Sequence, residues 1–269
     1  MSARDVLGLV PRESFVPDTI WVPVEGSGWM RPLHREDEPD GWTEQVRADR
    51  SVVIQVDDGA VGKGVWPTSS SSAPHVMADM LDALDLHAGM RVLEIGTGSG
   101  YNAALLAELA GAENVTTVEV DPSLAGHARR ALDRAGYPVT VVTGDGMLGH
   151  PDHAPYDRII VTAAVREVPY AWVEQARPGG VILVPWVATF HPDEPLARLE
   201  VGPDGTAEGR FGGPGWFMPL RSQRLKQRTI RATDERWAAS GRPEARRYGV
   251  TVTPGGQRVW LDSPGNPIG

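Results

Sequence analysis

The stretch VLEIGTGSGYNAALLAELAG, residues 92–111, decides the fold of this chain. Its first four residues are apolar except for one acid and predict a short buried strand. Three glycines within five residues follow, and strong helix formers come next. Glycines at such a turn permit unusual backbone dihedrals and let a ligand approach the main chain. We therefore expect a ligand to bind where this strand turns into its helix.

The same alternation continues on both sides of the glycine turn. A helical spacing of apolar residues precedes it at 75–84, and further strand and helix patterns follow it up to residue 186. Strands are predicted at 90–96, 114–120, 139–144, 156–164 and 181–186, and helices at 102–110, 122–136 and 169–180. Strands and helices that alternate in this way predict an α/β fold, in which a doubly wound, mainly parallel sheet carries helices on both faces.

The flanking regions have a different texture. Residues 1–75 are rich in proline, tryptophan and charge, and REDEPDGWTE at 35–44 is interpreted as an exposed acidic loop. Beyond residue 196, the segments 197–211 and 248–261 each predict two strands joined by a turn that contains proline and glycine. We accordingly expect an N-terminal segment at 1–75, a core at 76–224 and a C-terminal extension at 225–269.

Composition excludes several classes of function. The 269 residues include no cysteine, so disulfides, thiolate catalysis and cysteine-ligated zinc are excluded. A net charge of -9 argues against nucleic acid as the main partner. No apolar run reaches the roughly 20 residues of a membrane helix, and the first residues show no secretory signal. We expect a cytoplasmic protein without a metal site, and interpret HPDH at 150–153 as a loop.

The spacing of the glycines distinguishes two ligand classes. They follow a G-x-G-x-G pattern rather than the G-x-G-x-x-G of dinucleotide sites, and Glu94 stands two residues ahead of the first of them. An acid there would repel a pyrophosphate but suits the amino group of a methionine moiety. Glu119 ends the second strand, where it can accept hydrogen bonds from ribose hydroxyls, and Asp145 after the third strand can meet an adenine amino group. S-adenosylmethionine is therefore the expected cofactor, and a nicotinamide cofactor is the alternative.

The residues expected to bind this cofactor lie in three segments that each follow or end a predicted strand. They are Glu94, Gly96, Thr97, Gly98, Ser99, Gly100, Glu119, Asp145 and Gly146.

Several longer stretches carry a family resemblance. They are VPRESFVP at 10–17, SSSAPHVMADML at 70–81, the glycine turn, GDG at 144–146 and the run from YDRIIVTAAV to ILVP at 156–185. On these motifs the chain resembles the protein-L-isoaspartate O-methyltransferase family over about residues 5–20 and 65–220. The resemblance implies a seven-stranded Rossmann-like sheet whose last two strands form an antiparallel hairpin, which fits the hairpin predicted at 197–211.

The resemblance also implies the chemistry. The methyl acceptor is a carboxylate, Ser72 takes the place of the serine beside it, and Ser70 stands where the family has threonine. No general base is needed, since a carboxyl group with a pKa of about 4 is already anionic at neutral pH. The catalytic positions implied are therefore Ser72 and Ser70. The run Thr68–Ser72 could otherwise be a flexible loop.

The choice of substrate rests on two departures from the family pattern. Residues 18–67 are longer than the corresponding family segment, and a tail extends beyond residue 225. The tail and the TSSSSAP run at 68–74 resemble those of a branch that accompanies ATP-grasp enzymes and methylates an aspartate side chain in a modified ribosomal peptide, leading to aspartimide. The alternative is repair of L-isoaspartyl (D-aspartyl) residues in damaged proteins. A binding module without catalysis is a third possibility.

Four side chains remain open at this point. His75 is either a second contact near the acceptor or a capping or surface residue. Trp42, Trp66 and Trp216 either line a peptide groove or fill the core.

Overall fold

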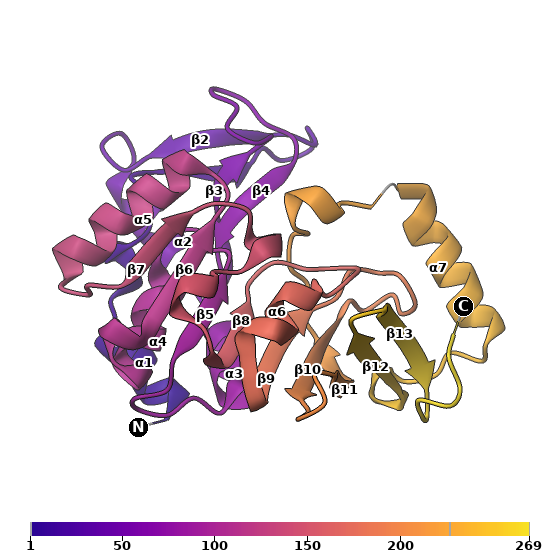
Figure 1. Ribbon diagram of the computed structural model, residues 1–269. Coiled ribbons are helices and arrows are strands. Elements are labelled where there is room, and N and C mark those ends of the chain that lie inside the picture. The colour runs from indigo at the N-terminus through magenta and orange to yellow at the C-terminus, as the bar shows by residue number, and fades with distance from the viewer. Residues whose placement is uncertain (1, 226, 269) are drawn as a thin grey trace. The chain divides into compact units, whose positions relative to one another are not determined.

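The chain forms two compact units in the computed structural model, which describes residues 2–225 and 227–268 and the side chains among them except 227–229. Unit 1 contains the described residues up to Gly89 together with Thr97–Gly144, and unit 2 contains Met90–Gly96 and the described residues from Asp145 onward. Both are shown in Figure 1.

Unit 1 holds two sheets. One is the antiparallel sheet with strand order β2-β1-β3-β4, and the other is the parallel strand pair β6 and β7, which belongs to the larger sheet of the chain. Its strands are β1 (Thr19–Pro23), β2 (Met30–His34), β3 (Val52–Val56), β4 (Pro67–Ser71), β6 (Val115–Glu119) and β7 (Thr140–Thr143). Its helices are α1 (Ala3–Leu9), η1 (Arg12–Ser14), α2 (Pro39–Arg47), α3 (Pro74–Leu84), α4 (Tyr101–Ala110), η2 (Ala112–Asn114) and α5 (Pro122–Ala135).

The predicted acidic loop at 35–44 is partly wrong, because helix α2 begins at Pro39. Trp42 and Val46 lie four residues apart on one face of this helix, and each is only 1% exposed. They pack in a cluster that also includes Leu124 of α5, and the Trp42 Nε1–H donates to the Pro17 carbonyl at 3.0 Å. The free energy gained by burying this apolar face stabilises the helix despite the acidic residues around it.

Helix α5 has the boundaries that its sequence signals predict. Asp121 caps its N-terminus by accepting hydrogen bonds from the Ser123 and Leu124 amides, and Pro122 stands in the first turn. Gly136 ends the helix in the left-handed conformation.

Unit 2 contains a run of strands in the order β13-β12-β11-β10-β9-β8-β5. Strands β5, β8 and β9 are parallel, and the remaining neighbours are antiparallel. The strands are β5 (Val92–Ile95), β8 (Tyr156–Val161), β9 (Ala176–Pro185), β10 (Pro195–Val201), β11 (Ala207–Pro214), β12 (Tyr248–Thr253) and β13 (Gly256–Leu261). The helices are η3 (Gly146–Leu148), η4 (Pro151–His153), α6 (Tyr170–Gln175), η5 (Arg221–Gln223), α7 (Gln227–Ala239) and η6 (Ala245–Arg247).

Both predicted hairpins are present, and the second one extends the sheet. Strands β10 and β11 form the hairpin expected from the family resemblance, and β12 pairs with β11 so that the tail hairpin joins the same sheet. Phe190 packs against Phe211 and Tyr248, with ring centroids 4.6 Å and 4.8 Å apart. The tail is thus joined to unit 2 by strand pairing and by a shared aromatic core.

The predicted helix at 169–180 is shorter than expected, because α6 ends at Gln175 and β9 already begins at Ala176. Pro178 disfavours helical dihedrals at the residue before it, so the chain leaves the helix early. Among the residues that the structure describes, no helix is long and apolar enough to cross a membrane.

Unit 1 carries a histidine that makes its stability depend on pH. The His127 Nε2 lies 2.6 Å from the Phe15 carbonyl oxygen, and burial lowers the pKa of this imidazole. The unfolded state therefore binds more protons between the folded and unfolded pKa values, so stability is lost as pH falls below about 6.5.

We expect the melting temperature to fall between pH 7.5 and pH 5.5, and the His127→Gln variant to show a smaller fall. Scanning calorimetry across this range measures both slopes. His87→Gln, at an exposed position beside Asp85, is the matched control, and the effect of burial is the change in slope in His127→Gln beyond any change in His87→Gln. Identical slopes for wild type and His127→Gln would contradict this assignment.

Candidate functional site

Residues 68–71 of the hydroxyl run lie in strand β4 (Pro67–Ser71) rather than in a flexible loop, and Ser72 directly follows this strand. Strand β4 pairs with β3, with Ser70 opposite Val53 and Ser71 opposite Val52. Ser71 is only 2% exposed, whereas Ser70 and Ser72 are half-buried. Because alternate residues of a strand point to opposite faces, Ser71 faces the interior between the two serines expected at the acceptor site.

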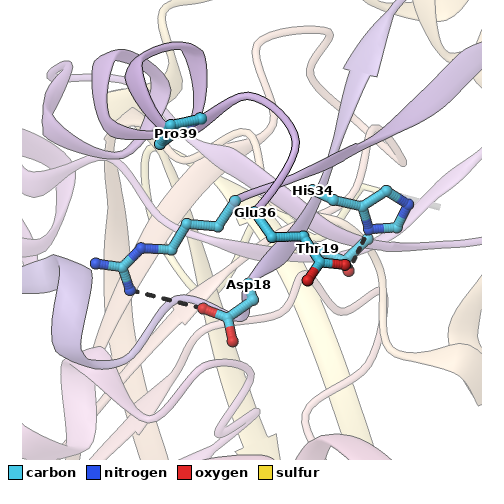
Figure 2. A pocket seen from close by; sticks show the side chains of 6 residues that line it. Asp18, Thr19, His34, Glu36 and Pro39 are labelled. Atoms are coloured by element: carbon cyan, nitrogen blue, oxygen red, sulfur yellow. Dashed lines mark hydrogen bonds and ion pairs between the residues drawn. The ribbon is translucent and has the colours of Figure 1, made fainter.

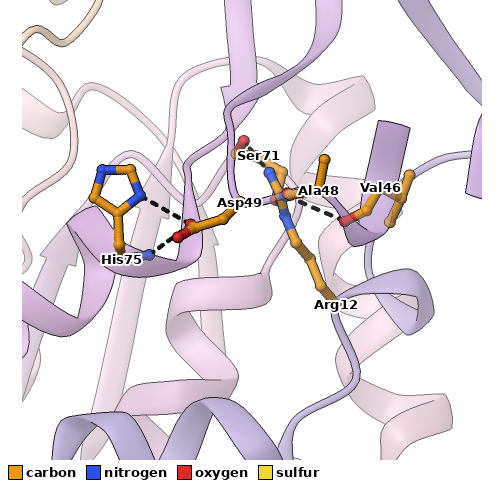
Figure 3. Close-up of polar contacts among 6 residues, drawn as sticks. All are labelled: Arg12, Val46, Ala48, Asp49, Ser71 and His75. Carbon is orange, nitrogen blue, oxygen red and sulfur yellow. Dashed lines mark hydrogen bonds and ion pairs between the residues drawn. The ribbon is translucent and has the colours of Figure 1, made fainter. Parts of the chain in front are cut away.

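Arg12, from the N-terminal VPRESFVP motif, holds the end of this strand (Figure 3). Its Nε–H donates to Ser71 Oγ at 3.1 Å, and its Nη2–H donates to the Ser71 carbonyl at 2.6 Å. Its Nη1–H groups donate to the carbonyls of Val46 and Ala48, both at 3.2 Å. Burial lowers the pKa of this guanidinium to about 10, so it stays charged at neutral pH.

Sequence reasoning missed Arg12 and Ser71 as parts of the site. The available signal was an arginine inside an otherwise apolar motif, since a buried arginine needs several hydrogen-bond acceptors.

His75 contacts an acid at the surface. Its backbone N–H donates to Asp49 Oδ1 at 3.0 Å, and its ring Nδ1 lies 2.8 Å from the same oxygen (Figure 3). These contacts, chiefly the backbone one, hold the pKa of the Asp49 carboxyl below its ordinary value. His75 stands in the first turn of α3, and both side chains are more than half exposed. His75 is therefore a surface residue whose backbone amide, in the first turn of α3, is capped by Asp49.

The glycine turn of unit 1 lies against the hydroxyl strand. Gly98 has a φ of +53°, and a Cβ placed on it would lie 3.3 Å from the Ser70 carbonyl oxygen and 3.7 Å from Ser69 Oγ. The Gly98 N–H donates to Glu119 Oε2 at 2.9 Å. One predicted cofactor residue, Gly98, thus lies close to a predicted acceptor residue and is hydrogen-bonded to the predicted ribose acid.

A chain of polar contacts leads from the hydroxyl strand to Glu119. Thr68 Oγ1–H donates to Gln55 Oε1 at 3.0 Å, and Gln55 Nε2–H donates to Asp121 Oδ2 at 2.9 Å. The Asp121 N–H in turn donates to Glu119 Oε1 at 3.0 Å. These contacts orient the Glu119 carboxylate. Gln55 and Asp121 were not predicted, because no local pattern links residues 66 positions apart.

Two predicted cofactor residues use their side chains to shape the turn itself. The Thr97 and Thr117 hydroxyl oxygens lie 2.6 Å apart, and Ser99 Oγ accepts a hydrogen bond from the first amide of α4 at 3.3 Å. Thr97 and Ser99 are each 3% exposed. At Gly100, a Cβ would lie 3.3 Å from the Ala128 Cβ, so glycine permits close packing of the turn on α5.

In unit 2, the turn begins at the end of β5. Glu94 is fully buried within this strand, at 0% exposure. Gly96 has a φ of +100°, and a Cβ on it would lie 2.8 Å from Thr162 Oγ1. That hydroxyl donates to the Gly96 carbonyl at 2.6 Å. A side chain at residue 96 would therefore be both strained and in collision.

Asp145 and Gly146 of the GDG segment belong to unit 2 and present an oriented carboxylate. Asp145 is exposed, and its Oδ1 accepts a hydrogen bond from the Met147 amide at 2.9 Å. The Gly146 carbonyl accepts a hydrogen bond from Trp172 Nε1 at 2.8 Å, and a Cβ on Gly146 would lie 2.6 Å from Ile95 Cγ2. Glycine is required at 146, and the Asp145 carboxylate is accessible to an amino group.

The three tryptophans have different environments. Trp42 belongs to the core, whereas Trp66 in unit 1 and Trp216 in unit 2 are 72% and 73% exposed. The HPDH segment forms the single turn η4, in which the rings of His150 and His153 pack edge to face.

A separate pocket of about 530 Å³ lies in the N-terminal part of unit 1 (Figure 2). Across it, Thr19 Oγ1 and His34 Nδ1 lie 2.9 Å apart, and Arg35 pairs with Asp18 at 3.6 Å. Its lining residues are Asp18, Thr19, His34, Arg35, Glu36 and Pro39. None of the residues predicted to bind cofactor or acceptor lines this pocket, although it falls within the long segment 18–67.

Comparison with known proteins identifies the family. The family model described as protein-L-isoaspartate(D-aspartate) O-methyltransferase matches residues 40–224. The protein-L-isoaspartate O-methyltransferase of Hyperthermus butylicus is 39% identical over 224 residues, which cover 78% of this chain and 77% of that protein. The protein of the same name from Methanococcoides burtonii is 54% identical over 151 residues, or 55% of this chain and 73% of that protein.

Solved structures show the same fold. A structure titled protein-L-isoaspartate O-methyltransferase aligns with a TM-score of 0.69 at 22% identity and covers 97% of this chain and 95% of its own. A Plasmodium falciparum structure, titled a putative protein of that name in complex with S-adenosyl-L-homocysteine, aligns with a TM-score of 0.59 at 16% identity and covers 82% and 90%.

These comparisons confirm the predicted α/β fold of S-adenosylmethionine-dependent methyltransferases and S-adenosylmethionine as the cofactor. The chain is a methyltransferase and belongs to the protein-L-isoaspartate(D-aspartate) O-methyltransferase family.

Proposed function

We propose that this protein transfers a methyl group from S-adenosylmethionine to the carboxylate of L-isoaspartyl residues in damaged proteins. The observation that carries this proposal is the close approach of Gly98, in the cofactor turn, to Ser70 of the hydroxyl strand. This contact brings a residue expected at the methyl donor next to one expected at the acceptor.

The residues present fit the cofactor. Gly96, Gly98 and Gly100 have positive φ angles, and neighbouring atoms leave little room for a side chain at these three positions of the turn. We assign the amino group of the methionine moiety to Glu94, the ribose hydroxyls to Glu119 and the adenine amino group to Asp145. The remaining assigned residues are Thr97, Ser99 and Gly146. When bound, S-adenosylmethionine supplies an electrophilic methyl group on a sulfonium.

The protein's task is to hold the acceptor in line. The acceptor carboxylate is anionic at neutral pH, so its oxygen forms the new bond without a general base. Hydroxyl groups of Ser70 and Ser72 donate to that carboxylate, while Arg12 fixes the strand between them through Ser71. Alignment and exclusion of water then account for the catalysis.

The ester that results continues to react without help from the enzyme. The backbone nitrogen of the following residue attacks the ester carbonyl, a proton is lost from that nitrogen, and methanol leaves. The product is a succinimide, and water opens its ring to aspartate or isoaspartate.

Repair is favoured over peptide tailoring for a structural reason. The long segment 18–67 and the tail beyond 225 first pointed to a ribosomal-peptide branch, but a structure titled protein-L-isoaspartate O-methyltransferase covers 97% of this chain. The long segment and the tail therefore do not by themselves indicate peptide tailoring. We assign 1–75 to the acceptor side, 76–224 to the methyltransferase core and 225–269 to an extension that supports it.

Methylation of an aspartate side chain in a peptide already crosslinked by an ATP-grasp enzyme, leading to aspartimide, is the second candidate. The run of four serines before Ala73-Pro74 is the observation that favours it. Mass spectrometry with an L-isoaspartyl peptide and such a crosslinked peptide, side by side, separates the two. Methyl gain on the first alone supports repair, methyl gain with methanol loss on the second alone supports tailoring, and no transfer to either contradicts both.

The acceptor role of the serines predicts a selective kinetic defect. We expect Ser72→Ala and Ser70→Ala each to lower kcat/KM for the acceptor about tenfold, because each removes a hydrogen bond to a charged group. The dissociation constant of S-adenosylmethionine, measured by calorimetry, should stay within twofold of wild type. Ser27→Ala, at an exposed turn of unit 1, is the control. If the serine variants lose cofactor affinity by the same factor as they lose acceptor kcat/KM, the serines do not act on the acceptor.

A further inference from the structure

The loop that follows β8 starts beside the glycine turn of unit 2. Strands β5 and β8 are parallel and in register, with Ile95 opposite Val161. At the next residue the Thr162 N–H donates to the Ile95 carbonyl at 2.9 Å, and its hydroxyl donates to the Gly96 carbonyl at 2.6 Å. Ligands of open α/β sheets bind at the carboxyl ends of the strands, so residues 162–168 lie at the edge where such ligands bind.

Backbone contacts hold the middle of this loop. The Ala164 N–H donates to the Met218 carbonyl, and the Leu220 N–H donates back to the Ala164 carbonyl, both at 2.9 Å. The Val165 N–H donates to the Pro185 carbonyl, also at 2.9 Å. The loop is thus pinned by segments from two other parts of the unit.

The last part of the loop is held by two glutamine side chains. Gln223, which is only 3% exposed, accepts hydrogen bonds at Oε1 from the amides of Arg166 and Glu167, at 2.8 Å and 3.0 Å. Its Nε2–H groups donate to the Glu167 carbonyl at 2.9 Å and to Met147 Sδ at 3.0 Å. Met147 directly follows Gly146 of the proposed adenine segment, so Gln223 ties that segment to the loop.

The second glutamine comes from the tail hairpin. Gln257 in β13 accepts a hydrogen bond at Oε1 from the Val168 amide at 2.9 Å, and its Nε2–H donates to the Arg166 carbonyl at 2.7 Å. The Arg166 carbonyl and the Val168 N–H are the two backbone groups that a residue of a neighbouring parallel strand would bond. The Gln257 side chain thus takes the place of a strand here. Gln257 lies outside residues 40–224, the part of the chain that the family model matches.

We propose that Gln223 and Gln257 are positioning residues for methyl transfer, and that the tail hairpin braces residues 166–168 through Gln257. This inference rests on the proposed function. At one end the loop contacts Gly96, and near the other it is tied to Met147, so its order governs both cofactor segments of unit 2. Gln223 holds the loop and the adenine segment together, whereas Gln257 holds the loop alone.

The test compares Gln257→Ala with Arg258→Ala, a neighbouring substitution on β13 at an exposed side chain. Gln257→Ala leaves the ties of the loop to Gly96 and Met147 in place. We therefore expect it to lower kcat/KM for the methyl acceptor about tenfold and to raise the dissociation constant of S-adenosylmethionine only about threefold. Gln223→Ala should lower both the acceptor kcat/KM and the cofactor affinity. Arg258→Ala should change neither quantity.

Amide hydrogen exchange gives a readout that needs no turnover. The amide of Val168 should exchange at least tenfold faster in Gln257→Ala than in wild type or Arg258→Ala, because it loses its acceptor. Faster exchange with unchanged kinetics would overturn the positioning role, and unchanged exchange would overturn the brace itself. No methyl transfer by the wild type would contradict the proposed function, and the exchange result would then still decide whether the brace exists. If Gln223→Ala fails to fold, Gln257→Ala decides alone, since this side chain is only half-buried.

Discussion

The Gly96→Ala variant is expected to bind S-adenosylmethionine about 100-fold more weakly than the wild type. Gly96 has a φ of +100°, where a side chain costs about 1–3 kcal/mol. The new Cβ would also lie 2.8 Å from Thr162 Oγ1 and force that hydroxyl away from the Gly96 carbonyl, at a similar cost. The turn relieves this strain by adopting another conformation. Cofactor binding must then restore the wild-type conformation, and this lowers the affinity.

Isothermal calorimetry measures this affinity directly. Gly136→Ala is the matched control, because Gly136 has a φ of +82° at the end of α5 but no atom near its Cβ position. It should lose about 1 kcal/mol of stability and retain wild-type cofactor affinity. A Gly96→Ala variant that binds the cofactor within threefold of wild type would remove this turn from the proposed site.

The Arg12→Met variant should lose both stability and acceptor binding. Methionine leaves the carbonyls of Val46, Ala48 and Ser71 without their guanidinium donors inside the protein, which costs about 3–5 kcal/mol. In a chain of this size that lowers the melting temperature by about 10 °C. Because Ser71 is then released, Ser70 and Ser72 lose their fixed positions, and KM for the acceptor rises.

Thermal unfolding and steady-state kinetics below the melting transition separate the two effects. Arg47→Gln is the control, because Arg47 forms an ion pair with Glu13 at 2.8 Å in which its own side chain is 67% exposed. Such surface pairs contribute about 1 kcal/mol or less. Arg12→Lys keeps the charge but not the planar fork of donors, and should fall between the other two variants. A melting temperature for Arg12→Met within 2 °C of Arg47→Gln would refute the role of Arg12.

The order of strands and helices could be predicted wherever local pattern and burial agree. The glycine turn, α5 with Pro122 at its start and Gly136 at its end, and the hairpins at 197–211 and 248–261 all carry their signals within a few residues. The predictions failed where a distant partner changed the outcome. Helix α2 forms within an acidic stretch because Trp42 and Val46 reach a core assembled from other elements.

In the candidate site, too, some residues could be predicted from local sequence, whereas others depend on contacts between distant segments. Residue types and spacing alone pointed to the cofactor turn and to the acids Glu94, Glu119 and Asp145, because their chemistry depends on which side chains are present and in what order. The hydroxyl run followed from the family resemblance. Tertiary structure decided which serine of that run is buried, since this depends on how β4 pairs with β3. It also decided that Arg12 holds Ser71 across 59 residues and that Gln257 holds Val168 across 89. Such contacts arise from strand register and packing between distant segments, and a single sequence contains no local pattern that reports them.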